Sequence, residues 1–445
     1  MRNPFLTLLG LLVLFSGHSQ EEPPTQFTLD QAIVYALDHN YSSINASRDI
    51  IDAQKQKWET IAEGLPQIDG HISYQNQLKQ PVSLIPGEFF GQDPGTFIPV
   101  TFGQPQQAIA TATLKQQIFD GSYIVGVQAT KAFMSYSLNN KEKTDLEVRA
   151  AVVEAYGNVL LAKETASILT QNLEALDKNL FETQKLYENG LGDEESVEQL
   201  QITRTQIDNE LKNAVRFESI TMQMFNLVMG LPLDHPSILL ENLDDLTQAQ
   251  IDPMLAESEF SVENNVDYKL AYNLNEQRYF ELKLAKSRAL PTLDAFVNYG
   301  SSAYSDTFNF LNGDQEWFDS SILGFDLNIP IFSSLRRSAS TQRAKIALEK
   351  AKTQLTETEE RIRLQLERAK SDYNLAIEQY GTSKENLHLA ERIETKNQIK
   401  YEEGLATSFE LRQAQLQLYS SQQEYLQSMV DVINRKTTLE TIINN

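Results

Sequence analysis

Four segments of the chain alternate between apolar or small residues and polar residues, with the period of two that is typical of a β-strand. They cover residues ~66–78, ~108–119, ~291–302 and ~320–331. In the first of them, one face holds Ile68, Gly70, Ile72 and Tyr74, and the other holds Gln67, Asp69, His71 and Ser73. A soluble sheet has the same alternation, but strands of about 10 residues with one polar face also suit a membrane barrel.

Four strands are too few to close a barrel, because small closed barrels need about eight. An open strand edge is not tolerated in lipid, since its backbone groups would be left without partners. If these strands cross a membrane, several copies of the chain therefore share one barrel. The loops between the strands, Lys79 to Gln107 and Ala303 to Asp319, would then be external.

Two runs of about 60 residues, ~129–188 and ~342–402, have helical periodicity, and each would span about 90 Å at 1.5 Å per residue. Their apolar seams repeat every 3.5 residues, as in coiled coils. Four shorter helices are predicted at ~42–63, ~194–229, ~267–288 and ~406–441. The helices ~42–63 and ~194–229 together have about the length of one long helix, and so do ~267–288 and ~406–441. Two short helices stacked end to end would therefore run beside each long one. The seams are rich in Ala, Ser and Gln, which favours a wall with water on both sides; the alternative is a polar extended coiled coil.

The same motifs occur twice in the chain, in the same order. Leu65-Pro66 recurs as Leu290-Pro291 before a strand, and Ile118-Phe119 recurs as Ile331-Phe332 before a long helix. The sequence Leu186-Tyr187-Glu188-Asn189-Gly190-Leu191 recurs as Lys400-Tyr401-Glu402-Glu403-Gly404-Leu405. We assign residues 20–240 to a first repeat and 241–445 to a second. Tandem units with one order of elements pack around a pseudo-symmetry axis.

Residues 1–19 are predicted to be a secretory signal, with Arg2 before a short apolar run and small residues ahead of Gln20. An uncleaved anchor is the alternative. The net charge of −23 argues against nucleic acid as a partner. The chain contains no cysteine, which excludes disulfides, thiolate metal sites and an N-terminal lipidated cysteine.

Gly190 and Gly404 close the long helices, where a left-handed residue is expected. Acidic residues surround both turns, among them Glu195 and Glu410. Acids gathered around an axis repel one another and attract cations, so they are candidates for a gate or selectivity element. The alternative is that acids near a helix N-terminus only complement its dipole. We place Glu410 about one turn inside its helix, which favours the functional interpretation there.

These features together resemble the TolC-like outer membrane efflux protein family, over about Phe27 to Asn445. The residues that carry the resemblance are Phe27-Thr28-Leu29-Asp30-Gln31-Ala32, the two Leu-Pro pairs, Ile118-Phe119-Asp120-Gly121-Ser122, Pro330-Ile331-Phe332-Ser333 and the two Tyr-x-x-Gly-Leu turns. The resemblance implies a mixed α/β membrane protein that forms a homotrimer. Each copy would give four strands to a shared twelve-stranded transmembrane β-barrel, which continues into a long α-helical coiled-coil barrel in the periplasm.

The resemblance also implies an outer membrane channel, docked through its tips to a periplasmic adaptor and an inner membrane transporter. The implied docking residues are Gly190, Leu191, Gly404 and Leu405. Family members place acids six and nine residues after the second tip glycine, where this chain has Glu410 and Gln413, so one carboxylate is missing. Other implied constriction residues are Tyr401, which matches an aromatic of the family, and Ser196, the first-repeat equivalent of Glu410; a basic residue often found two after the second glycine is Ala406 here.

Catalysis is not supported by the sequence. The histidines are scattered without ligand spacing, and there is no nucleophile elbow, P-loop or GxGxxG. We therefore expect no enzyme activity, no cofactor and no metal. The leading hypothesis is a passive exit duct for an efflux or type I secretion assembly, in contact with outer membrane lipid. The alternatives are an exported coiled-coil structural or adhesive protein and a free-standing porin.

Overall fold

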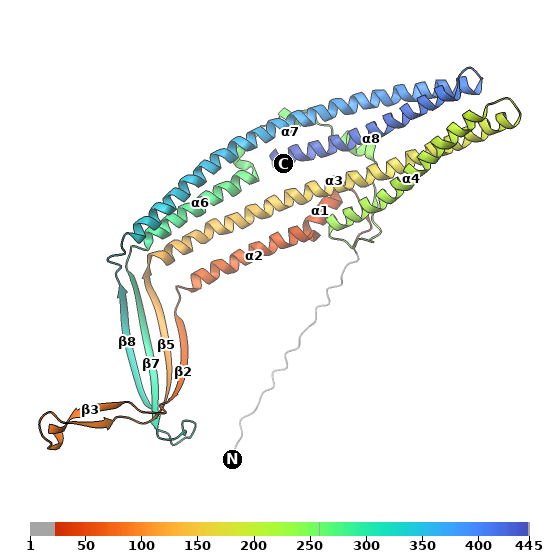
Figure 1. Ribbon diagram of the computed structural model, residues 1–445. Helices are drawn as coiled ribbons and strands as arrows, with labels where there is room; N and C mark the ends of the chain where they lie inside the picture. Colours follow the sequence, from red (N-terminus) through yellow and green to blue (C-terminus); the bar gives the residue numbers. More distant parts are fainter. Residues whose placement is uncertain (1–22, 258, 444–445) are drawn as a thin grey trace, which may run out of the picture. The chain divides into compact units, whose positions relative to one another are not determined.

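The computed structural model of the protein describes residues 23–257 and 259–443 (Figure 1). The expected signal sequence lies outside these residues. Within the chain, one compact unit holds the residues up to Tyr41, Glu147–Glu257 and Ser371–Thr438, and we call it the tip unit. The other holds Ser42–Leu146, the segment ending at Lys370, and the residues from Leu439 on, and we call it the strand unit.

The strand unit contains a four-stranded antiparallel sheet in the order β2-β5-β7-β8 (Figure 1). Its strands are β2 (Gln67–Asn76), β5 (Gln106–Asp120), β7 (Thr292–Ser305) and β8 (Phe318–Asn328). The two hairpins, one from each repeat, are joined through β5 and β7, so β2 and β8 are the edges. All four predicted strands are therefore present in one sheet.

The register gives the sheet one apolar and one polar face. Ile68, Leu114, Val297 and Leu323 form a row across all four strands. The next row, on the opposite face, contains Asp69, Thr113 and Asn298 and ends at Ile322 of β8. Asn298 Nδ2 donates to Thr113 Oγ1 at 2.9 Å. The apolar face is open, with Ile68 72% and Leu323 68% exposed.

The polar face has its own packing constraint at Gly324. Gly324 is paired with Phe296, and a Cβ atom at Gly324 would lie 2.4 Å from the Phe296 ring. The ring thus occupies the space above the glycine, which explains why a residue without a side chain interrupts β8.

The first loop contains secondary structure that the sequence analysis did not predict. It contains a hairpin of β3 (Val82–Pro86) and β4 (Phe97–Thr101), closed by the short 3-10 helix η1 (Gly87–Phe90). The prolines that mask the strand pattern lie at positions that a two-stranded ribbon tolerates. In the second loop, Phe308 and Phe310 pack against Tyr74. Their ring centroids lie 5.4 and 5.8 Å, respectively, from that of Tyr74.

The two long helices are α3 (Gly121–Glu188, 68 residues) and α7 (Arg336–Glu402, 67 residues). Both begin earlier than expected. Asp120 Oδ1, at the end of β5, accepts hydrogen bonds from the backbone amides of Ser122 and Tyr123 at 2.6 and 3.4 Å, which starts α3 directly after the strand. The expected seam of α7 is buried along its length, at Ile362, Leu366, Ala369, Tyr373, Ala376 and Tyr380.

The short helices are α2 (Tyr41–Ala62) and α6 (Val266–Ser287), of 22 residues each, and α4 (Glu194–Met229) and α8 (Ser408–Ile443), of 36 residues each. An asparagine precedes each of the two 22-residue helices. Within the tip unit, Asn40, just before α2, donates to Val228 O near the end of α4 at 2.7 Å. Within the strand unit, Asn265, just before α6, donates to Ile442 O near the end of α8 at 2.8 Å. The two repeats thus share this asparagine contact.

The tip unit also contains several small elements that were not predicted from the sequence. They are α1 (Leu29–His39), α5 (Leu243–Gln250), and the two-residue strands β1 (Gln26–Phe27) and β6 (Ile238–Leu239), which pair in parallel. Each long helix has a fully buried tyrosine whose hydroxyl forms hydrogen bonds with the segments of these elements. The Tyr156 hydroxyl of α3 donates to the Glu241 carboxylate at 2.7 Å, and the Tyr373 hydroxyl of α7 donates to Gln250 O at 2.8 Å.

Among the described residues, the model contains no helix whose length and apolar character would let it cross a bilayer.

Candidate constriction at the two glycine turns

Both long helices end in the same hydrogen-bonded turn. Gly190 and Gly404 each have φ 73°, a conformation that glycine adopts without strain. The amides after them, of Leu191 and Leu405, donate to Leu186 O at 2.9 Å and to Lys400 O at 2.7 Å. This is the Schellman arrangement, which satisfies the last carbonyls of a helix. The sequence prediction of left-handed glycines at both tips is confirmed.

The two turns lie side by side in the tip unit (Figure 1). Ser196 lies near the start of α4, and Ser408 is the first residue of α8. Their Oγ atoms are 2.7 Å apart. Asp193 is the N-cap of α4 and accepts from the Ser196 amide at 2.7 Å. Hydrogen bonds from the Ser196 amide and hydroxyl lower the pKa of Asp193, so this acid stays ionised at neutral pH. Ser196 thus joins the two tips.

Glu410 has a role in helix capping that differs from the sequence expectation. Helix α8 begins at Ser408, so Glu410 lies in its first turn rather than one turn inside the helix. Its carboxylate accepts from the Thr407 amide at 2.8 Å, while the Glu410 amide donates to Thr407 Oγ1 at 3.3 Å, which is a capping box. Hydrogen bonds to this carboxylate from the Thr407 amide and, second, from the Thr407 hydroxyl at 3.1 Å lower the pKa of Glu410. Glu410 is exposed and ionised at neutral pH.

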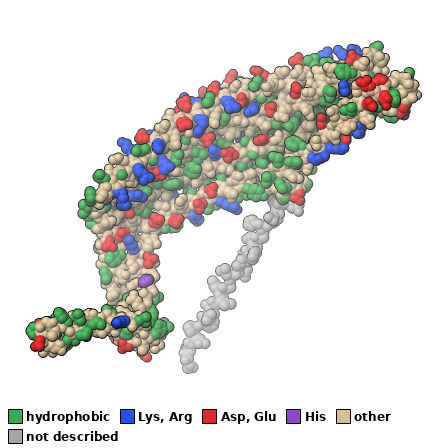
Figure 2. Space-filling model, in the orientation of Figure 1, with side chains coloured by type: hydrophobic (Ala, Val, Ile, Leu, Met, Phe, Trp, Pro, Cys, Tyr) green, Lys and Arg blue, Asp and Glu red, His purple; other side chains and the backbone are tan. Residues whose placement is uncertain are grey.

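The remaining predicted tip residues are at the surface. Glu195 is exposed and accepts from Gln199 Nε2 at 3.0 Å, and Gln413 is exposed on α8. Leu191 and Leu405 are 78% and 73% exposed, which is unusual for leucines next to a tight turn. Figure 2 shows acidic side chains gathered at this end of the tip unit. The tips therefore have two exposed leucines surrounded by acidic residues.

Tyr401 belongs to a ladder of polar contacts between the two long helices that the sequence analysis missed. The Tyr401 hydroxyl of α7 is 2.7 Å from Thr183 Oγ1 of α3. Below it, Asn179 and Gln398 exchange two amide hydrogen bonds, both of 3.1 Å. Asn179 and Thr183 are buried. Asn172, one heptad before Asn179, donates to Gln422 of α8 at 3.0 Å, and this heptad spacing of asparagines is the signal that could have revealed the ladder.

Leucines alternate with this ladder on α3. Leu169 and Leu176 are buried against Leu200 and Ile207 of α4. This apolar cluster therefore joins α3 mainly to α4, with Tyr419 of α8 packed against it, whereas the polar ladder joins α3 to α7 and α8. Such contacts can be exchanged for bonds to water at a small net free energy, because the net contribution of one hydrogen bond is about 0.5–1.5 kcal/mol.

A half-buried acid lies further along the same interface. Burial raises the pKa of Glu394 in α7, and a hydrogen bond from the buried Gln415 of α8 partly opposes this shift. Tyr419 of α8 is also shifted, since its burial raises the pKa of the hydroxyl. Neither residue was singled out in the sequence.

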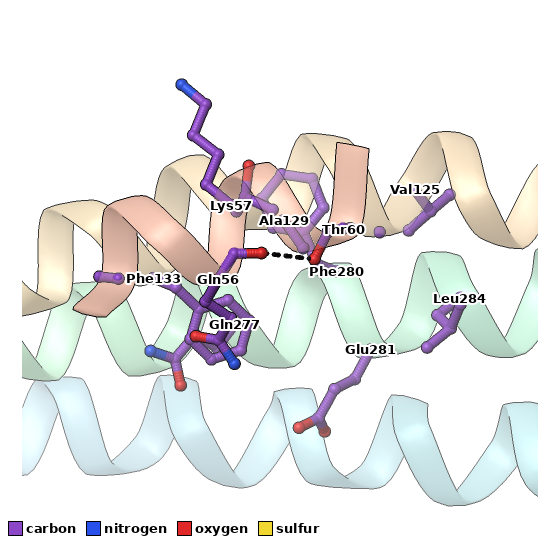
Figure 3. Close-up of a pocket in the computed structure, with 13 residues that line it drawn as sticks. Gln56, Lys57, Thr60, Val125, Ala129, Phe133, Gln277, Phe280, Glu281 and Leu284 are labelled. Carbon is purple, nitrogen blue, oxygen red and sulfur yellow. Dashed lines mark hydrogen bonds between the residues drawn. The ribbon is translucent and has the colours of Figure 1, made fainter. Parts of the chain in front are cut away.

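A separate cavity lies in the strand unit, where α2, α3 and α6 meet (Figure 3). It has a volume of about 260 Å³ and is lined mainly by apolar side chains, with Phe133 and Phe280 at its wall. Lys57 points away from it in Figure 3. None of the tip residues lines this cavity, so it is distinct from the candidate constriction.

No group of His, Asp or Glu side chains within residues 23–257 and 259–443 is arranged to hold a metal ion. The histidines described have local contacts instead: His39 stacks on Tyr35 at 3.9 Å, and His235 Nδ1 is 2.9 Å from Ser237 Oγ.

The outer membrane efflux protein family model matches residues 263–445. Among curated proteins, the proteases secretion protein PrtF of Dickeya chrysanthemi is 24% identical over 259 residues, which is 56% of this chain and 53% of that protein. The match thus spans about half the length of this relative.

Solved channels have the same fold along nearly the whole chain. The outer membrane protein VceC of Vibrio cholerae matches with a TM-score of 0.70 at 15% identity, over 94% of this chain and 96% of its own. The CmeC outer membrane channel of Campylobacter jejuni matches with a TM-score of 0.73 at 15% identity, over 93% and 85%. The open MtrE channel of Neisseria gonorrhoeae gives 0.68 at 15% identity, over 94% and 89%. The expected fold class, long helices with a four-stranded sheet in each copy, is confirmed.

Proposed function

We propose that this chain, a member of the outer membrane efflux protein family through residues 263–445 and through its fold, is a passive exit duct across the outer membrane. The observation that carries the proposal is the sheet. An apolar row crosses all four strands on one face, and polar residues of β2, β5 and β7 follow one another across the other, as expected of a wall between lipid and water. The family and its solved members are channels rather than enzymes, and we propose no catalysis, metal or cofactor for this chain.

The duct is a homotrimer. Strands β2 and β8 are edges whose backbone groups have no partner strand in the described sheet, and lipid does not tolerate such edges. Three copies supply the twelve strands of one closed barrel, and the long helices continue it as a coiled-coil barrel in the periplasm. The two repeats, 20–240 and 241–445, thus contribute one hairpin and one set of helices each.

The duct operates with partners at its tips. Leu191 and Leu405, beside Gly190 and Gly404, form an exposed apolar contact for a periplasmic adaptor, and the adaptor connects the duct to an inner membrane transporter. The assembly is an efflux or type I secretion system. The relative named as a proteases secretion protein supports secretion, and the match to the outer membrane efflux protein model supports efflux.

Membrane fractionation tests this proposal against an exported adhesive coiled coil. We expect the full chain in the outer membrane fraction, resistant to extraction with alkaline carbonate, because the apolar face of the sheet contacts lipid. Recovery in soluble or carbonate-extracted fractions would contradict the duct. A free-standing porin would fractionate in the same way, but it would not be recovered with an adaptor after crosslinking in intact cells.

Replacing Glu410 with glutamine is expected to lower the preference of the duct for cations. Three copies of this ionised carboxylate lie around the constriction, and a glutamine at the third helical position retains the capping box. The measurement is the reversal potential in planar bilayers under a salt gradient. Glu154→Gln, an exposed acid of α3, is the control and should leave selectivity unchanged. An unchanged reversal potential for Glu410→Gln would mean that the carboxylate serves only as a helix cap.

A further inference from the structure

We infer that the hairpin of β3 and β4 is a lipid anchor, whose apolar face lies among the acyl chains of the outer leaflet around the mouth of the duct. The inference rests on the proposed function, because it requires the apolar face of the sheet to contact lipid. The hairpin follows β2 at the end of the sheet opposite the helices, which is the external end of the duct (Figure 1). The 10 residues of β2 reach the outer surface of the bilayer, since a transmembrane strand needs about 9–11.

The hairpin has a large exposed apolar surface. Between residues 78 and 102, seven large apolar side chains are more than half exposed, with Leu78 at 94% and Phe89 at 78%. The other five are Val82, Leu84, Phe90, Phe97 and Phe102. Figure 2 shows hydrophobic side chains along the hairpin. In the described sheets, β3 and β4 pair only with each other, and an isolated two-stranded hairpin is at best marginally stable in water. An apolar cover would therefore also stabilise it.

One face of the hairpin is apolar along its whole length. The register places six exposed residues on this face: Val82, Leu84 and Pro86 of β3, and Phe97, Pro99 and Thr101 of β4. Thr101 alone among them has a polar side chain. The three aliphatic residues of the opposite face are half-buried: Ile85, Ile98 and Val100. Continuous exposed apolar surface of this kind marks a contact with a membrane or with another protein.

The hairpin is poor in charge, unlike the second loop at the same end of the sheet. Residues 78–104 contain three charged residues, Lys79, Glu88 and Asp93, although 22% of the whole chain is charged. Residues 306–319 of the second loop contain four acids and no base. The second loop thus has the composition of a segment in water, and the hairpin has that of a segment that leaves water.

The hairpin also continues the face of the sheet that contacts lipid in the proposed duct. Ile72 of β2 is on that face and is exposed. The pairing of β2 with β5 extends beyond Asn76, since the Gln77 amide donates to Pro105 O at 2.7 Å. Because side chains alternate along a strand, Leu78 lies on the same face as Ile72. The lipid-facing surface therefore reaches the root of the hairpin.

A second copy or another protein could cover the hairpin by adding a strand to its edge. Each strand has a proline, Pro86 in β3 and Pro99 in β4, and proline has no amide hydrogen to donate. Prolines on edge strands discourage such additions. Lipid needs no backbone pairing if the hairpin lies in the interface, where headgroups and water satisfy its edges while its apolar side chains enter the acyl layer. These features together favour lipid.

Spin labelling tests the anchor, and the chain has no native cysteine to interfere. Phe89→Cys carries a nitroxide in the full chain, which is reconstituted in vesicles of phosphatidylethanolamine and phosphatidylglycerol. Oxygen concentrates among acyl chains, whereas a water-soluble nickel chelate does not enter them. We expect the ratio of oxygen to nickel collisions at Phe89→Cys to be several-fold higher than at Asp314→Cys, an exposed position of the second loop. It should be close to the ratio at Ile72→Cys on the lipid-facing side of the sheet.

The reference positions separate failure of the anchor from failure of the duct. A label at Phe89→Cys that nickel reaches as freely as at Asp314→Cys, with Ile72→Cys in lipid, would overturn the anchor and leave the duct intact. A label shielded from both reagents, or broadened by a second label until unlabelled chain is added, would assign the hairpin to a second copy and also overturn the anchor. Free access of nickel to Ile72→Cys would overturn the lipid-facing sheet, and with it the duct itself.

Discussion

Replacing Tyr373 with alanine is expected to lower the free energy of unfolding by about 3–5 kcal/mol, the usual range for truncating a large buried aromatic residue. Tyr373 is fully buried, and its hydroxyl donates to Gln250 O and accepts from the Asp252 amide at 2.8 and 2.9 Å. The alanine variant loses the packing of the ring and leaves both backbone groups without this partner. The measurement is the midpoint of the thermal loss of helical circular dichroism.

Two further variants separate packing from hydrogen bonding. Tyr373→Phe keeps the ring and removes only the hydroxyl, and we expect it to cost about 1–3 kcal/mol because buried polar groups lose their partner. Tyr41→Ala removes an exposed tyrosine and should change the midpoint little. Equal midpoints for Tyr373→Ala and Tyr41→Ala would show that this tyrosine does not anchor the segment after α5.

The double variant Thr183→Val/Tyr401→Phe is expected to open the duct. It removes the hydrogen bond between α3 and α7 next to the tips, and it leaves no buried hydroxyl without a partner. At about 0.5–1.5 kcal/mol for each bond, loss in three copies shifts the balance between closed and open tips by roughly ten- to a thousandfold. The readout is the mean conductance of single channels in planar bilayers.

Tyr187→Phe is the matched control for this variant. Tyr187 is the equivalent of Tyr401 in the first repeat, but it is exposed. Its replacement should leave conductance unchanged. If the double variant also has wild-type conductance, the ladder between α3 and α7 does not hold the tips closed, and the acids at the turns become the better candidates for the gate.

The regular parts of this fold could be predicted from the sequence, because they carry strong periodic signals. The alternation that begins at Ile68 placed β2, and its repeat placed β7. The lengths of the short helices were also predicted, since α2 and α6 have 22 residues each and α4 and α8 have 36 each. Periodicity and tandem repetition are properties of whole elements. They therefore predicted the order of the elements well, but the residues at which the elements begin less well.

The remaining parts depend on contacts that leave little trace in local sequence. Strands β1 and β6 have two residues each, too few for any period, and they form only because distant segments meet beside Tyr156. The sequence analysis did not single out Asn172 and Asn179, which are buried and paired across helices.

The capping role of Glu410 could have been predicted. Thr407-Ser408-Phe409-Glu410 has the spacing of a capping box, with a hydroxyl residue three before an acid. The same carboxylate can cap α8 and face the constriction, because capping uses the backbone side of the helix start and leaves the residue exposed. The position of Glu410 at the tip thus follows from local helix chemistry, and its influence on ions is the separate proposal tested above.

Single-channel recording from the purified full chain in planar bilayers decides whether this chain forms a water-filled duct through a membrane. We expect discrete, long-lived conductance steps for the wild type, and larger steps for Thr183→Val/Tyr401→Phe. A trimeric preparation in which neither protein gives steps above the protein-free bilayer would contradict the duct.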